Sequence, residues 1–188
     1  MAKRGMKAHS LASIQTDASD TAKAVQALHQ SRPEAVIMIT AGKPTFEFIK
    51  EYNKVRRGMQ FYTLSVMGAN ANIKALGSDG VGVVVTSVVP FPWSQAHPLV
   101  KEYQAAMQRI GVRDYSFVSF ESYINSKVLG EAIRRAGKDL TRAKLVAAAE
   151  SMKQVSFGGF DITFGKDSRQ GSKFVDLTII GPNGKFTK

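Results

Sequence analysis

Residues 35–89 read AVIMITAGKPTFEFIKEYNKVRRGMQFYTLSVMGANANIKALGSDGVGVVVTSVV, and this stretch decides the fold. Three apolar runs in it are short and rich in β-branched residues, which predicts buried strands at 35–41, 61–66 and 81–89. Amphipathic helices are predicted between the strands, at 43–57 and 70–76. Strands that alternate with helices across short loops indicate an α/β fold with a parallel, Rossmann-like sheet and flanking helices.

Small residues follow the first two strands, at the place where an open α/β sheet binds ligands, just beyond the carboxyl ends of its parallel strands. The candidate ligand-binding residues in these two loops are Thr40, Ala41, Gly42, Ser65, Val66 and Met67. We expect them to form one wall of a ligand site.

The third strand has no helix directly after it and continues into an aromatic segment stiffened by two prolines, Pro90-Phe91-Pro92-Trp93. Phe91 and Trp93 allow two interpretations. They fill the junction between two packed units, or they border a ligand cleft, where aromatic walls are common. Either interpretation makes this segment a crossover out of the first part of the chain.

Outside this stretch, the sequence predicts a polar strand at 7–15 and a helix at 20–30. After Trp93, three amphipathic helices are predicted with no strand among them, at 97–110, 119–136 and 141–152. Two further strands, at 157–164 and 173–180, are predicted to pair antiparallel. The three helices need a surface to bury against, so they pack on one another or on a sheet supplied by a missing segment or another chain.

Composition excludes several classes of function. The 188 residues contain no cysteine, which rules out disulfides and zinc–thiolate sites. No apolar run reaches the roughly 18 residues that a membrane helix needs, and the N-terminus lacks the apolar core of a signal peptide. The net charge of +11 raises a nucleic-acid-binding α/β protein as the alternative function, but the basic residues are spread along the chain. We therefore favour a solvated basic surface and expect no nucleic acid as partner.

No catalytic constellation is apparent. The segment 40–45 lacks the first glycine of a phosphate loop and has Pro44 where magnesium binding needs a hydroxyl. His9, His29 and His97 lie far apart and have no metal-ligand spacing. The sequence predicts a protein that is not an enzyme and has no cofactor and no metal.

The order of these segments resembles a known family. Residues 34–107 (EAVIMITAGKPTFEFIKEYNKVRRGMQFYTLSVMGANANIKALGSDGVGVVVTSVVPFPWSQAHPLVKEYQAAM), followed by SFVSFESYINSKVLGEAIRRAGKDLTRAKLVAAAESM and FGGFDITFGKDSRQGSKFVDLTIIGPNGKF, are similar to the later half of type I periplasmic binding proteins. The most similar branch is the leucine/isoleucine/valine-binding one of ABC-transporter substrate receptors. Members have two α/β lobes joined by three crossovers and about twice this length.

The resemblance implies a partial periplasmic-binding-protein fold and a function. Residues 1–89 correspond to part of the second lobe, 90–156 to a crossover and helices of the first lobe, and 157–188 to a β-hairpin that returns through the hinge. The implied function is a periplasmic solute-binding component of an ABC importer, a fragment with half of a cleft that closes on a small amino acid or related carboxylate. Its implied partners are that ligand, the transporter permease and a second copy that contacts exposed apolar helix faces.

The same resemblance carries ligand contacts onto the two loops named above. Branched-chain amino-acid binders often place an acidic residue in the second loop, where it holds the ligand ammonium. Ser65 stands at that place in this sequence. An aromatic acid or an amide-like ligand is therefore as consistent with the sequence as a plain α-amino acid.

Overall fold

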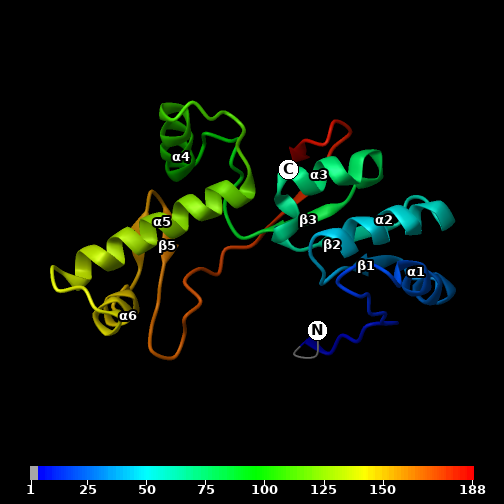
Figure 1. Ribbon diagram of the computed structural model, residues 1–188, viewed down its shortest axis with the longest axis horizontal. Helices are drawn as coiled ribbons and strands as arrows, with labels where there is room; N and C mark the ends of the chain where they lie inside the picture. Colours follow the sequence, from blue (N-terminus) through cyan, green and yellow to red (C-terminus); the bar gives the residue numbers. More distant parts are fainter. Residues whose placement is uncertain (1–3) are drawn as a thin grey trace. The chain divides into compact units, whose positions relative to one another are not determined.

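The computed structural model describes residues 4–188 (Figure 1). The chain divides into two compact units. Unit 1 contains the residues up to Thr86 together with Leu177–Lys188, and unit 2 contains Ser87–Asp176. The first three residues of the predicted segment 1–89 lie outside the described part.

Unit 1 is built on a mixed, mostly parallel sheet with the strand order β1-β2-β3-β6-β7. Its strands are β1 (Ala35–Ile37), β2 (Gln60–Thr63), β3 (Val84–Ser87), β6 (Asp176–Ile180) and β7 (Phe186–Thr187). The first three strands are parallel, with Ile37 paired to Tyr62 and Tyr62 paired to Val84. The last two form an antiparallel hairpin at the C-terminus, as predicted.

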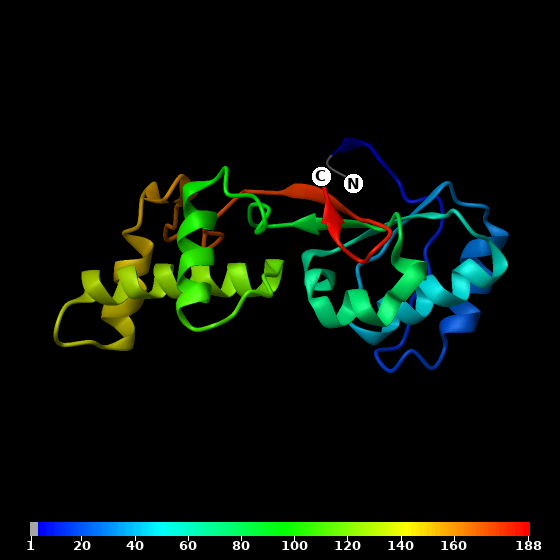
Figure 2. The same ribbon diagram turned by 90° about the horizontal axis from the view of Figure 1, so that it is seen from above.

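Helices cover one face of this sheet: α1 (Thr21–Gln30), α2 (Lys43–Val55) and α3 (Asn70–Leu76). Figure 2 shows all three on the same side of the strands. The Tyr52 ring of α2 meets the Phe61 ring of β2 edge-on, with centroids 5.7 Å apart. Ile49 and Tyr52 are fully buried, so the apolar face of α2 supplies much of the core.

The helix predictions for unit 1 are confirmed, and α3 has its predicted bounds. The strands are shorter than predicted: β1 ends at Ile37, and residues 65–68 form a 3₁₀ turn instead of continuing β2. The strand predicted at 7–15 is wrong, because no strand of the described chain pairs with it. A polar segment without a neighbouring strand has nothing to satisfy its backbone in an extended ladder.

Unit 2 contains α4 (Pro98–Arg109), α5 (Phe117–Ala136) and α6 (Arg142–Glu150), close to the predicted positions. Ser116 and Ser119 form a capping box that starts α5. Tyr103 of α4 is fully buried and stacks on Phe120 with ring centroids 4.8 Å apart. The three helices therefore pack partly on one another.

Polar contacts also tie α4 to α5. Glu102 accepts a hydrogen bond from Tyr123 at 2.8 Å and forms an ion pair with Lys127. The hydrogen bond from Lys127, reinforced by that from Tyr123, lowers the pKa of the Glu102 carboxyl. Burial and the neighbouring Glu102 carboxylate raise the pKa of Tyr123 to about 12.

The predicted pairing of 157–164 with 173–180 is wrong. Instead, β4 (Val155–Phe157) pairs antiparallel with β5 (Phe160–Ile162), while the later segment joins the sheet of unit 1 as β6. Gly158 and Gly159 form the two-residue turn between β4 and β5, both with positive φ. A tight hairpin turn of this kind requires positive φ and selects glycine pairs.

Within residues 4–188, no helix combines the length and the apolar character that crossing a membrane requires. The same residues contain no cluster of three or more metal-binding side chains of the His, Cys, Asp or Glu type.

Candidate ligand-binding site

The two predicted binding loops follow neighbouring parallel strands and leave the sheet at the same edge. Ile37 and Tyr62 are register partners, and Thr40 and Ser65 each lie three residues beyond them. The pairing extends one step past β1, because the Met38 amide donates to the Tyr62 carbonyl at 2.8 Å. Adjacent strands are about 4.8 Å apart, so the two loops begin side by side.

The first loop is fixed to the helix that follows it. The Thr40 hydroxyl lies 2.7 Å from the Thr45 hydroxyl, and the Gly42 carbonyl accepts the Thr45 amide at 3.1 Å. Gly42 caps α2 with φ 63° and ψ −138°, a conformation that side chains strongly disfavour. Ala41 is exposed, so this loop presents backbone and a small side chain to solvent.

The second loop is a 3₁₀ turn over Ser65–Gly68. Ser65 is half-buried and Val66 is exposed, and the Val66 carbonyl accepts a hydrogen bond from the Asn72 side chain at 3.0 Å. The Met67 side chain is fully buried, and its amide donates to the Leu64 carbonyl. Met67 therefore holds the turn in place, and only its backbone remains for a ligand.

Two charged residues near the first loop did not stand out in the sequence. Lys43 is the first residue of α2, directly after Gly42, and both Lys43 and Asp17 are exposed. Hydrogen bonds from Ser19 hold the pKa of the Asp17 carboxyl below its usual range, and the nearby Lys43 ammonium adds to this effect. A cation and an anion therefore lie near one another beside this loop. Only the fold brings them together, because 26 positions separate them.

Phe91 and Trp93 lie in unit 2, where both rings contact Phe117 at the start of α5. The ring centroids of Phe91 and Trp93 are 5.0 Å apart, and those of Trp93 and Phe117 are 5.4 Å apart in an edge-on arrangement. Phe117 is buried, whereas Phe91 and Trp93 keep partial exposure. The cluster anchors the proline-rich crossover to α5. Sequence reasoning missed Phe117, which carried no local signal.

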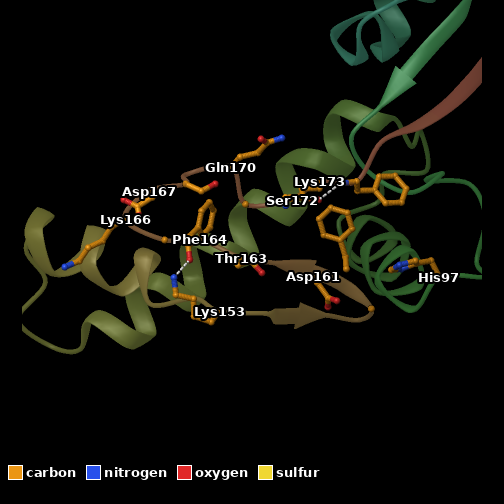
Figure 3. Close-up of a pocket in the computed structure, with 16 residues that line it drawn as sticks. His97, Lys153, Asp161, Thr163, Phe164, Lys166, Asp167, Gln170, Ser172 and Lys173 are labelled. Atoms are coloured by element: carbon orange, nitrogen blue, oxygen red, sulfur yellow. Dashed lines mark hydrogen bonds between the residues drawn. The ribbon is translucent and has the colours of Figure 1, made fainter. Parts of the chain in front are cut away.

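Unit 2 has a hollow of about 710 Å³, shown in Figure 3. Residues 159–174 form most of its wall, and His97 and Lys153 complete it. The Lys153 ammonium donates to the Phe164 carbonyl at 2.7 Å, which closes one side (Figure 3). None of the sequence-predicted binding residues lines this hollow.

A smaller hollow of about 280 Å³ lies in unit 1. Its wall includes Met59, Phe61, Val81 and Val83, at the amino ends of the parallel strands. The two loops leave from the carboxyl ends, so this hollow is at the opposite edge of the sheet. Neither hollow is therefore formed by the predicted loops.

Comparison with protein families identifies one match. The model of the family described as "Periplasmic binding protein" matches residues 2–181. No curated protein matches the sequence.

Solved structures agree with this match. A possible leucine/isoleucine/valine-binding protein from Rhodopirellula baltica is 31% identical with a TM-score of 0.80, and the match covers 93% of this chain and 47% of that one. A substrate-binding periplasmic protein from Ralstonia solanacearum is 28% identical with a TM-score of 0.78, covering 92% and 49%. A branched-chain amino-acid ABC transporter protein from Thermus thermophilus with bound valine shares the fold at 18% identity and a TM-score of 0.72, covering 90% and 48%.

The chain thus spans about half the length of the solved structures it matches. These matches confirm the predicted partial periplasmic-binding-protein fold, with a mostly parallel sheet, flanking helices and an antiparallel C-terminal hairpin.

Proposed function

The chain belongs to the periplasmic binding protein family, and on that premise we propose that it is a solute-binding component of an ABC importer. One observation carries the proposal: residues 2–181 match a family of solute-binding, non-enzymatic proteins. We propose that unit 1 corresponds to part of the second lobe of that fold. Unit 2 supplies helices to the first lobe, and the segments that join the units serve as hinge crossovers.

We further propose that Thr40, Ala41, Gly42, Ser65, Val66 and Met67 form one wall of the ligand cleft. Their support is the shared carboxyl edge of β1 and β2, the position at which α/β sheets bind ligands. Phe91 and Trp93 border the cleft or the hinge from the other unit's sequence. The ligand is a small amino acid or a related carboxylate.

The charges beside the first loop bear on the ligand's chemistry. Lys43 offers a cation for a carboxylate, and Asp17 offers an anion for an ammonium group, which Ser65 does not supply. In this proposal Asp17 takes over the role of the acidic residue that branched-chain binders place in the second loop.

Such proteins bind by closing two lobes over the solute, so a chain with one wall of the cleft makes only part of the hydrogen bonds. We therefore propose that these 188 residues act as a fragment with half of a cleft. Isothermal titration with leucine, valine, glutamate and benzoate should show no binding tighter than micromolar. Submicromolar affinity for any of them in the isolated chain would refute the half-cleft proposal.

The location and partners follow from the same premise. We propose a periplasmic protein that works with an ABC permease. In the isolated chain, two copies pair through exposed apolar residues of α5, including Leu129 and Ile133. Light scattering should report a dimer that Ile133→Glu dissociates. A monomer at the highest concentration that the scattering experiment allows would count against this pairing.

A further inference from the structure

The sheet of unit 1 has one covered face and one bare face. The face under the helices contains Val36, Phe61 and Val85, all buried. The opposite face contains Ile37 and Ile39, which are 60% and 80% exposed, together with Leu64 and Ile179. Alternation along β1 and the register of β1 with β2 place Ile37, Ile39 and Leu64 on the same side.

Ile179 extends this bare face across the sheet. Thr178 and Ile180 are buried on the covered side, and the Thr178 hydroxyl donates to the Val85 carbonyl at 3.1 Å. Ile179 therefore points to the other side, where it is exposed. The bare face carries large apolar side chains from β1, from the end of β2 and from β6.

β1 also ends the sheet. It is the first strand in the order, so its outer side has no strand partner within residues 4–188. A short exposed edge next to an apolar face invites pairing with further polypeptide. Parallel strands are found almost only in sheets that helices cover on both sides, whereas this sheet has helices on one side.

From these observations we propose that the bare face of unit 1 is a docking surface for an α/β segment with an amphipathic helix. The segment is of the kind contained in the half of the longer relatives that this chain does not match. A second copy fits less well, because it would offer its own bare sheet, and sheet-on-sheet packing belongs to antiparallel sandwiches. The proposal rests on family membership and sheet geometry, and it is independent of the proposed ligand.

The test uses the full 188-residue chain and, as a separate polypeptide, the part of the Rhodopirellula baltica protein outside the match. Size-exclusion chromatography with light scattering should show a one-to-one complex. Ile37→Glu and Ile179→Glu should each weaken the complex at least about tenfold, since each places a charge in the buried contact. Ile110→Glu, at a 72% exposed site in unit 2, is the matched control and should leave it unchanged.

Circular dichroism establishes that each variant is folded, and Ile37→Thr, which keeps β propensity, repeats the test if Ile37→Glu does not fold. Three results would overturn the proposal: no complex with the unmodified chain, equal weakening by the unit 2 control, or a self-dimer that Ile37→Glu dissociates. Because no solute is added, failure here leaves the solute-binding proposal standing. Failure of the calorimetry likewise leaves this docking surface untouched.

Discussion

Replacing Gly42 by alanine should destabilise unit 1 through backbone conformation alone. Gly42 has φ 63° and ψ −138°, and a Cβ atom added there would meet no heavy atom within 4 Å. Steric clash with neighbours therefore contributes nothing. Holding a residue with a side chain in such a region costs on the order of 1–3 kcal/mol. For a urea dependence of about 2 kcal/mol per M, the unfolding midpoint should fall by roughly 1 M.

Gly130→Ala is the matched control with the opposite sign. Gly130 lies inside α5, and a Cβ atom there would also meet nothing within 4 Å. Because alanine suits a helix interior better than glycine, the substitution should stabilise unit 2 by about 0.5–1 kcal/mol.

The two units can be followed separately in one experiment. Trp93 is the single tryptophan and lies in unit 2, so its fluorescence reports that unit, while hydrogen exchange of the α2 amides reports unit 1. Gly42→Ala should accelerate exchange in α2 and leave the tryptophan transition in place. Unchanged exchange, or a stabilised unit 1, would refute the assigned loop conformation and with it the placement of the first binding loop.

Three further predictions concern unit 2 and are checked by urea unfolding followed through tryptophan fluorescence. Gly158→Ala should cost more than Gly159→Ala, about 2–4 against 1–2 kcal/mol, because only at Gly158 would the new Cβ press on the α4 backbone, at 3.0 Å; equal losses would contradict this. Tyr103→Phe should cost about 0.5–1.5 kcal/mol, since it removes the 2.6 Å hydrogen bond to Ser119, and a loss below about 0.2 kcal/mol, well under the usual range for a hydrogen bond, would show that this bond contributes little. The folded-state pKa of Glu102 is lowered, so its contribution to stability is present above the ordinary glutamate pKa of 4.5 and is lost as the pH falls through the folded-state value. Glu102→Gln should therefore lose less stability than the unmodified chain between about pH 7 and pH 3, near the ends of the titration range of a carboxyl group, and identical pH profiles would argue against the link.

Helices were the most predictable part of this fold because their signals are local. The apolar spacing and the flanking Gly77 give α3 its predicted bounds, and α5 begins two residues before the predicted 119. The difference at α5 comes from Ser116, whose side chain caps the Ser119 amide. Ser116 and Ser119 form a capping box in which serine stands where glutamate is usual, so the motif was not apparent in the sequence.

Strands were less predictable because a strand exists only beside a partner. Residues 7–15 have the composition of a polar strand, yet no neighbouring strand fixes them. The segment 173–180 was predicted to pair with the preceding strand, but β6 belongs to a sheet whose other strands lie about 90 residues earlier. Only the turn at Gly158 and Gly159 carried a local signal that would have corrected the pairing.

The candidate site divides in the same way. Small residues after two strands are readable in the sequence, and the parallel register places them at one edge. The approach of Lys43 to Asp17 and the packing of Phe117 on Trp93 depend on the folded chain, since nothing in their spacing marks them.

Unit 1 is discontinuous: its sheet takes β1 to β3 from the first 87 residues and β6 and β7 from the last 13. During synthesis, the first three strands leave the ribosome long before their neighbours exist. Unit 2 is one continuous segment, Ser87–Asp176, and can fold as soon as it emerges. The edge of β3 must therefore wait, with its hydrogen-bonding groups open, until translation is complete. We expect the nascent chain to depend on chaperones in this interval, and stop codons near the C-terminus to be as damaging as those in the middle of the gene.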